Sequence, residues 1–262
     1  MPYEQAVQEL KVKFKGIRNE YRELSQYSPI EFVTGRVKKI SSILEKAKRY
    51  NIPEDKIFSE MEDIVGIRIM CQFIDDIYQV VEHIHKRDGK DMHVVYEKDY
   101  VNGYKESGYR SYHIIIRYPV QTIEGEKDIL AELQIRTLAM NFWATIEHSL
   151  NYKYKENIPM AIKQRLIKSA EAAAELDMEM YEIRQEIINA QLAFEEKSNT
   201  VSDIISNIQR LSLTGKMKEA IEFQNKFDEL WDSGTQEDLE NLLQEIKWKL
   251  PSYKIFEKQE DK

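Results

Sequence analysis

The chain has 262 residues, 42% hydrophobic and 32% charged, which is typical of a globular protein that buries its core without disulfide or metal staples. The single cysteine, Cys71, excludes a disulfide framework, and no apolar run reaches the roughly 18–20 residues of a membrane span, so we expect a soluble cytoplasmic protein. The net charge of −8 falls entirely on residues 156–262, while residues 1–50 are locally basic, which argues against a nucleic-acid coat and favours a focused anion site.

Hydrophobic periodicity predicts helices before, between and after a set of strands. In chain order, we expect helices at 4–26 and 31–50, a strand at 64–73, a helix at 75–87, strands at 93–100, 111–118 and 128–136, a helix at 138–154, a long helix from Pro159 to about 197, and two or three shorter helices over 200–250. This order predicts an α/β core with a helical C-terminal extension.

The strands at 111–118 and 128–136 each have one apolar and one polar face, because side chains alternate along a strand. The polar face of the second strand carries Glu132, Gln134 and Arg136. If the two strands share a sheet, His113 lies on the same side as Glu132 and Gln134. A solvated outer face is the alternative interpretation.

Asp63 stands directly before the strand at 64–73. An acid at the mouth of one strand and another inside a second strand, Glu132, can share a divalent cation. Mg²⁺ usually takes one or two protein carboxylates together with phosphate oxygens and water. The alternative for Asp63 alone is a turn or cap residue.

A basic stripe follows the predicted helix at 31–50. Its members are spaced four, four and three residues apart, which stacks them on one helical face: Lys38, Ser42, Lys46 and Arg49. Three cations and a hydroxyl match a polyphosphate chain, although a solvated basic face is the alternative. The sequence has no GxxxxGK[ST] or GxGxxG motif, so side chains and a metal would have to hold the phosphates.

The segment ESGYRSYH, residues 106–113, places aromatic and hydrogen-bonding groups at the mouth of a strand. Gly108 allows the loop to approach a ligand closely, and a tyrosine ring can stack on a planar base. Alternation places Tyr112 in the core and leaves Tyr109 free. Lys105, Arg110 and His113 would then face phosphates or sugar; the alternative is that both tyrosines are core aromatics.

Five stretches in order resemble the small alarmone synthetases, the single-domain branch of the RelA/SpoT family. They are EFVTGRVK (31–38), EDIVGIRIMCQF (62–73), KESGYRSYH (105–113), AELQIRTLAMNFWATIEHSLNYKY (131–154) and the long helix after Pro159. The resemblance covers roughly residues 2–197. It implies a nucleotidyltransferase-like mixed β-sheet flanked by helices, and transfer of the β,γ-pyrophosphate of ATP to the ribose 3′-hydroxyl of GDP or GTP, giving AMP and ppGpp or pppGpp.

The resemblance also implies roles for particular residues. It makes Asp63 and Glu132 the Mg²⁺ pair, with Glu132 also helping to deprotonate the attacking hydroxyl. Adenine would lie between Arg36 and Arg68. The ATP phosphates would be held by Lys38, Ser42, Lys46 and Arg49. Guanine would stack on Tyr109, with further acceptor contacts from Lys105, His113, Gln134 and Asn141.

The family further suggests a homotetramer that binds ATP and GDP or GTP, with regulation by (p)ppGpp or single-stranded RNA. Lys15, Phe32 and Thr34 are the residues expected at an allosteric product site. The apolar stripe of the long helix would serve as an interface or as a core seam.

We expect two domains: a synthetase domain at 1–197, including the long helix, and an additional helical extension at 198–262 with no family role. No His-Asp pair of a hydrolase occurs, so we expect synthesis without hydrolysis. Two alternatives stay open. The first is another nucleotidyltransferase-fold enzyme that modifies RNA or protein, although no Gly-Ser motif precedes Asp75 and Asp76. The second is a non-catalytic RNA-binding helical protein, which the acidic balance of 156–262 disfavours.

Overall fold

A computed structural model describes residues 1–154 and 158–250, which divide into two compact units, the first Met1–Ile183 and the second beginning at Arg184. The helix α6 (Met160–Leu213) contributes residues to both units, and the expected domain boundary at 197/198 lies inside it. Within the described ranges, no helix combines the length and apolarity needed to cross a membrane.

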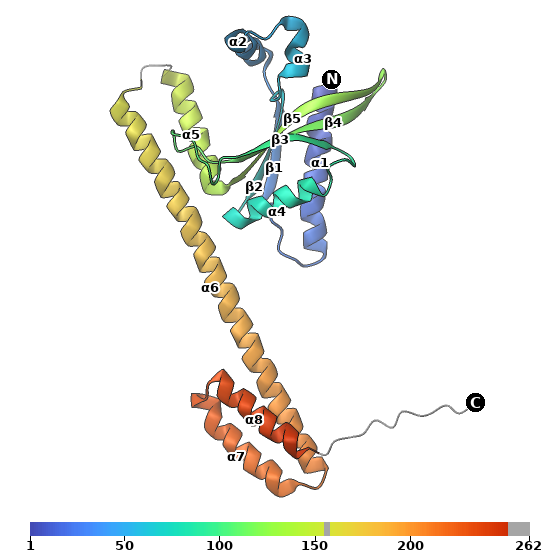
Figure 1. Cartoon of the computed structure of the whole chain (residues 1–262), viewed down its shortest axis with the longest axis vertical. Coiled ribbons are helices and arrows are strands. Elements are labelled where there is room, and N and C mark those ends of the chain that lie inside the picture. The colour runs from blue at the N-terminus through green and yellow to red at the C-terminus, as the bar shows by residue number, and fades with distance from the viewer. Residues whose placement is uncertain (155–157, 251–262) are drawn as a thin grey trace, which may run out of the picture. The chain divides into compact units, whose positions relative to one another are not determined.

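The first unit is built on a five-stranded mixed sheet in the order β1-β2-β5-β4-β3 (Figure 1). The strands are β1 (Phe32–Val37), β2 (Val65–Cys71), β3 (His93–Asp99), β4 (Tyr112–Thr122) and β5 (Gly125–Thr137). β2 and β5 run parallel, and the other neighbouring pairs are antiparallel. This arrangement confirms the predicted α/β class with a mixed sheet flanked by helices.

One face of the sheet is covered by α1 (Pro2–Glu23) and α4 (Ile74–His85) (Figure 1). Leu10 and Phe14 of α1 are fully buried against the sheet, as are Ile77 and Ile84 of α4. The apolar faces predicted for β4 and β5 point into this core, which leaves their polar faces on the opposite side of the sheet.

The prediction of one helix over 31–50 is wrong. Residues 32–37 form β1, which pairs antiparallel with β2, and α2 begins only at Ile40 and ends at Tyr50. The valines and threonine of FVTGRV suit a strand, and tertiary pairing outweighs the helical spacing. A Cβ on Gly35 would lie 2.7 Å from the Ile67 side chain, so glycine permits this packing.

The apolar face of α2 is narrow. The residues buried on it are Ile43 and Ala47, whereas Ile40 and Leu44 are 76% and 53% exposed. Ile43 and Ala47 pack in a small cluster with residues of η1 (Glu54–Lys56), α3 (Ile57–Glu60) and the turn before β2. The members of that cluster are Ile43, Ala47, Ile57, Met61 and Ile64.

The sheet is followed by α5 (Leu138–Tyr154) and then by α6. The expectation that the long helix ends near 197 is wrong, because α6 continues for 54 residues to Leu213. Its sequence contains no glycine or proline to stop it. It ends where Gly215 adopts a left-handed φ of 84° and the Lys216 amide donates to the Leu211 carbonyl at 3.1 Å, a glycine-based helix end.

The second unit packs the end of α6 against a hairpin of α7 (Met217–Ser233) and α8 (Gln236–Lys249), which agrees with the shorter helices predicted over 200–250. Leu239 and Ile246 are fully buried in its core. Phe227 and Leu242 are buried too, whereas Ile221, Trp231 and Trp248 are exposed.

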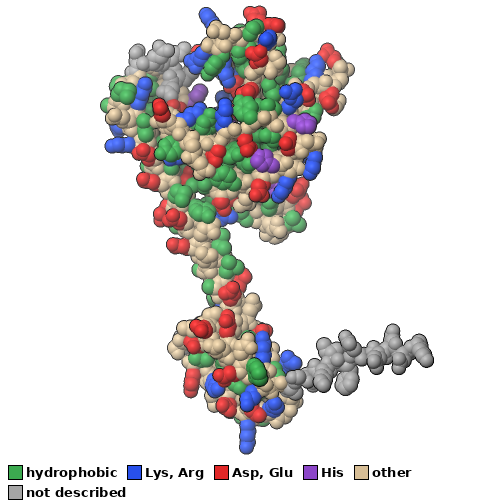
Figure 2. Space-filling model, viewed as in Figure 1, with side chains coloured by type: hydrophobic (Ala, Val, Ile, Leu, Met, Phe, Trp, Pro, Cys, Tyr) green, Lys and Arg blue, Asp and Glu red, His purple; other side chains and the backbone are tan. Residues whose placement is uncertain are grey.

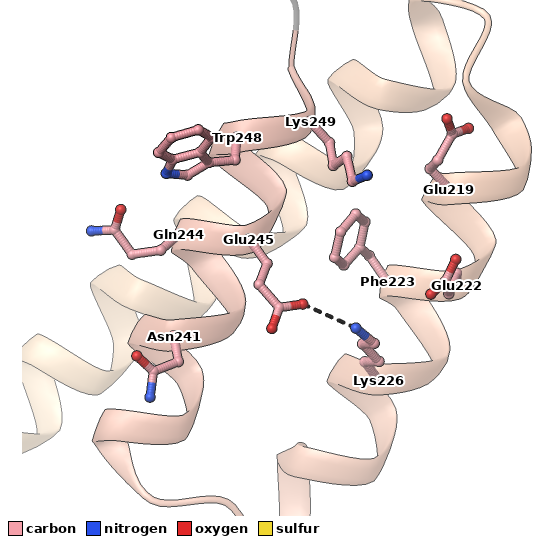
Figure 3. A pocket seen from close by; sticks show the side chains of 9 residues that line it. All are labelled: Glu219, Glu222, Phe223, Lys226, Asn241, Gln244, Glu245, Trp248 and Lys249. Atoms are coloured by element: carbon pink, nitrogen blue, oxygen red, sulfur yellow. Dashed lines mark hydrogen bonds and ion pairs between the residues drawn. The ribbon is translucent and has the colours of Figure 1, made fainter.

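A hollow lies between α7 and α8 and is lined by Phe223, Trp248 and mainly polar side chains (Figure 3). Lys226 and Glu245 form an ion pair of 2.9 Å across it. Because both partners are about half exposed, this pair contributes little to stability.

Candidate active site

The polar face of the sheet carries residues from every strand. Its register aligns Thr34, Arg68, Gln134, His113 and Lys98 in one row across β1, β2, β5, β4 and β3. These residues are distant in sequence, and strand pairing alone makes them neighbours.

A second row lies two residues away along the strands and contains Arg36, Gly66, Glu132, Ile115 and Tyr96. The glycine between Arg36 and Glu132 leaves space above the sheet. In the space-filling view, Lys and Arg side chains and a histidine lie in a hollow on the face of the first unit (Figure 2).

Glu132 is held at the centre of this face by two hydrogen-bond donors. His113 Nδ1 lies 2.9 Å from Oε1, and Gln134 Nε2 donates to Oε2 at 2.7 Å. This confirms the predicted proximity of the three residues. Burial alone would raise the pKa of Glu132, but the contacts with His113 and Gln134 outweigh it and hold the pKa below its usual value.

Asp63 binds two lysines through one carboxylate oxygen. Lys38 Nζ lies 2.8 Å and Lys46 Nζ 2.9 Å from Oδ2, whereas Oδ1 is buried and has no hydrogen-bond partner. Burial alone would raise the pKa of Asp63, but the two lysines together outweigh this effect and hold the pKa below its usual value. The charge of Asp63 also acts on Glu132, so the two carboxylates share one electrostatic environment.

This pair of carboxylates fits Mg²⁺ better than a metal bound by a full cage of protein ligands. Among residues 1–154 and 158–250, no cluster of three or more His, Cys, Asp or Glu side chains is arranged to hold a metal. Two carboxylates with one buried free oxygen match a cation that takes most of its ligands from phosphates and water.

The predicted phosphate-binding stripe is only partly helical. Lys38 precedes α2, and its ammonium reaches the site from the end of β1, whereas Lys46 reaches it from α2 itself. Ser42 is half-buried and Arg49 exposed on the same helix. Their spacing from Lys46 is helical as predicted, but Lys38 belongs to the strand-helix junction.

Arg36 and Arg68 lie on adjacent rows of the same face. Arg68 Nε donates to Gln134 Oε1 at 3.2 Å, and Arg36 is exposed. Burial, followed by the neighbouring charges of Arg136 and Arg36, lowers the pKa of the Arg68 guanidinium, so this side of the face concentrates positive charge.

Tyr109 is not free, which corrects the prediction from strand alternation. Its side chain is partly buried, its hydroxyl lies 2.8 Å from His113 Nε2, and the buried Arg136 donates to the same oxygen. Lys105 Nζ lies 5.1 Å from the Tyr109 ring centre and 4.6 Å from the Tyr100 ring centre. These residues form one aromatic and cationic cluster beside Glu132.

Sequence reasoning missed Tyr100 as a member of this cluster. Its ring packs edge-on against His113 at 5.3 Å and against Tyr109 at 6.2 Å, measured between ring centres. Tyr100 follows Tyr96 and Lys98 at spacings of two residues along and just beyond β3. This alternation could have placed it on the same face of the sheet. Tyr96 was missed too; its hydroxyl donates to Glu62, next to Asp63.

The remaining predicted residues lie around this centre. Asn141, in the first turn of α5, has a buried Oδ1 without a hydrogen-bond partner, so the group is available to a ligand. Phe32 and Thr34 are exposed on β1, and Lys15 is exposed on α1. No contact found in the described residues joins Lys15 to Phe32 or Thr34.

Asp177 of α6 is a buried carboxylate that accepts a 2.6 Å hydrogen bond from Thr137, at the end of β5. Burial raises its pKa to about 6, against the lowering effects of Thr137 and Arg110. The folded state therefore binds this proton more tightly than the unfolded state, and the stability it provides is lost as pH rises from about 4 through 6.

We expect Asp177→Asn to stabilise the protein above pH 6, by up to about 3 kcal/mol, because the amide oxygen still accepts from Thr137 and no charge is buried. The gain should grow between about pH 4 and 6 and stay constant above. Thermal unfolding at a series of pH values measures it, with the exposed Asp203→Asn on the same helix as control. A gain that does not vary with pH would contradict the raised pKa.

One acid on the polar face of a mixed sheet and one in the turn before β2, both near lysines and arginines, are groups suited to phosphoryl transfer. The chain belongs to the RelA/SpoT family: a model described as the region found in RelA and SpoT proteins matches residues 35–157, and the following relatives agree with it. The chain is 60% identical to the GTP pyrophosphokinase YjbM of Bacillus subtilis over 197 residues, which are 75% of this chain and 92% of that protein.

Solved structures give the same result. The small alarmone synthetase 1 of B. subtilis bound to its product pppGpp matches with a TM-score of 0.68 and 60% identity, over 71% of this chain and 95% of that one. The same synthetase bound to AMPCPP matches with a TM-score of 0.63 and 56% identity, over 72% and 95%. The close relatives are thus small alarmone synthetases, which confirms the resemblance drawn from the motifs.

Proposed function

We propose that this protein is a (p)ppGpp synthetase, a GTP pyrophosphokinase that transfers the β,γ-pyrophosphate of ATP to the ribose 3′-hydroxyl of GDP or GTP and releases AMP. The observation that carries this proposal is a pair of electrostatically coupled carboxylates: Glu132 on the polar face of β5, bonded by His113 and Gln134, and Asp63 in the turn before β2, bonded by Lys38 and Lys46. Relatives that share this fold and 60% of the aligned sequence are GTP pyrophosphokinases.

Asp63 and Glu132 would hold Mg²⁺, which neutralises charge on the transferred phosphates when it is bound. The buried Oδ1 of Asp63, which lacks a hydrogen-bond partner, supports this assignment. Lys38 and Lys46 already converge on the same carboxylate, so they are placed to bind the phosphate oxygens of ATP beside it. Ser42 and Arg49 extend the phosphate site along α2, and Arg36 and Arg68 flank the adenine.

In the proposed reaction, the acceptor 3′-hydroxyl attacks the β-phosphorus in line with the departing AMP. The low pKa of Glu132 keeps it ionised, so it can accept a hydrogen bond from the hydroxyl and orient it. Glu132 is also the candidate for taking the proton. Most of the rate enhancement would come from orientation and charge neutralisation by the lysines and arginines.

The acceptor nucleotide would bind at the cluster around Tyr109. Tyr109 offers its ring to guanine, with Lys105, His113, Gln134 and Asn141 as polar partners. Tyr100 supplies a second aromatic wall, because it contacts both Tyr109 and His113. Base-aromatic stacking of this kind contributes about 1–3 kcal/mol per base.

We further propose a synthetase domain at 1–197 and an additional helical extension at 198–262. The aligned relative leaves about a quarter of this chain unmatched, which is the size of this extension. The exposed Met180, Ile183 and Ile187 of α6 support assembly through this helix, with a homotetramer as the expected form. The proposal includes a cytoplasmic location and synthesis without hydrolysis. It also includes regulation, either by (p)ppGpp at Lys15, Phe32 and Thr34 or by single-stranded RNA.

The test is to incubate the protein with ATP, Mg²⁺ and either GDP or GTP, and to identify the nucleotide products. Formation of AMP together with ppGpp or pppGpp supports the proposal. Release of inorganic pyrophosphate would select a nucleotidyltransferase that modifies RNA or protein. No turnover, together with a gel shift of short single-stranded RNA, would favour a non-catalytic binding protein.

A further inference from the structure

We propose that Ala170 of α6 is a positioning residue for the acceptor loop, residues 105–113: its contact with Gly108 sets the place of Tyr109. The inference rests on the proposed function, because it assigns the loop to the acceptor nucleotide. It adds that the long helix, which supplies none of the predicted site residues, determines how well the acceptor binds.

The contact between Gly108 and Ala170 leaves no room for a larger side chain. Gly108 is buried and has a left-handed φ of 86°. A Cβ at position 108 would lie 2.5 Å from the Cβ of Ala170 and 3.7 Å from the carbonyl oxygen of Ile167. The loop therefore rests directly on the helix, and the smallest side chains at 108 and 170 are what allow it.

Polar contacts fix the same stretch of α6 from both sides. Arg110, in the loop, donates to the Ala170 carbonyl at 3.3 Å. Trp143 of α5 donates from Nε1 to the Leu166 carbonyl and to Ser169 Oγ, each at 3.0 Å. Ala170 itself is 3% exposed. The helix is thus anchored to α5 at the point where the loop touches it.

The contact between Gly108 and Ala170 lies next to the residues proposed to bind the acceptor. Tyr109 follows Gly108 in sequence and packs against the small apolar cluster of Trp143, Ala144 and Ala170. The Tyr109 hydroxyl reaches His113, which in turn contacts Glu132. A displacement of the loop away from α6 therefore moves the acceptor side of the site, and an error of about 1 Å in such placement can cost 10²-fold in rate.

Among the described residues, no contact joins the phosphate-binding residues of the donor side to Ala170. Lys38 lies between β1 and α2, Lys46 on α2, and Asp63 between α3 and β2, at the other end of the sheet order from the loop. A disturbance at Ala170 should therefore raise the KM for GDP or GTP and leave the KM for ATP unchanged. A general loss of folding would not change one KM and leave the other unchanged.

A double-mutant cycle tests the contact. Gly108→Ala introduces the clash, and we expect kcat/KM for GDP to fall about tenfold or more with an unchanged KM for ATP. Ala170→Gly removes the opposing methyl group, so the double variant should recover at least about threefold of the loss. Recovery is expected to be partial, because alanine at a φ of 86° stays strained.

Two controls keep the cycle interpretable. Ala172→Gly on the exposed face of α6 carries the same helical cost without touching the loop, and it should rescue nothing. Ala170→Leu creates the same clash by enlarging the side chain on the helix, and Ala172→Leu is its matched control. This second pair is used if thermal unfolding shows that Gly108→Ala does not fold. Equal losses of Gly108→Ala in both backgrounds, or parallel rises in both KM values, would overturn the inference. If the unaltered protein forms no alarmone from ATP and GDP, the proposed function fails instead.

Discussion

Glu132→Gln is expected to lower kcat by about 10²- to 10⁴-fold while the fold stays intact, the range typical for loss of a proton-accepting group. The substitution removes the negative charge but keeps the shape of the side chain. One carboxylate oxygen becomes an amide that donates rather than accepts, so one of the contacts with His113 and Gln134 must also be lost. Both effects act on the acceptor hydroxyl and on the proposed metal.

The measurement is the rate of AMP formation under saturating ATP, Mg²⁺ and GDP, with thermal unfolding to confirm the fold. Glu126→Gln on the same strand is the matched control, because Glu126 is exposed and contacts only Gln121 among the described residues. It should keep full activity. A Glu132→Gln enzyme that retains more than about a tenth of the activity would remove Glu132 from the proposed mechanism.

The polar face of the sheet was predictable because strand alternation is strictly two residues. Glu132, Gln134 and His113 were placed together on this ground alone, and their contacts confirm it. Alternation also identified Arg136 on this face. Its bond to Tyr109 was not predictable, since it joins a strand residue to a loop whose path depends on α6.

Features that depend on tertiary pairing were not predictable. Residues 32–37 have helical spacing with α2, but they pair with β2, and only the complete sheet makes that the better solution. Tyr100 follows β3 in phase, yet its approach to His113 requires the register of β3 on β4. Local patterns fix which face a side chain occupies, whereas register fixes its neighbours.

The arrangement at Asp63 gives the second large effect. Its Oδ2 binds Lys38 and Lys46 and so holds the two ammonium groups proposed to bind phosphate. Its Oδ1 is buried without a hydrogen-bond partner. A carboxylate is the only group that can satisfy both ammonium ions and still offer an oxygen to a cation. Asparagine can accept from the lysines, but then it points an NH₂ group at the position proposed for Mg²⁺.

Asp63→Asn should therefore lower kcat by at least about 10²-fold and raise the Mg²⁺ concentration needed for half-maximal activity by about tenfold or more, since losing a ligand weakens a metal site at least as much as losing a supporting contact. Mg²⁺ titration of activity, together with calorimetric titration of Mn²⁺ in the presence of AMPCPP, separates the two effects. Glu60→Gln, an exposed acid that pairs only with Lys56 among the described residues, is the matched control and should titrate like the unaltered enzyme. If Asp63→Asn loses activity but keeps its Mg²⁺ requirement and Mn²⁺ affinity, Asp63 serves to place Lys38 and Lys46 and does not bind the metal.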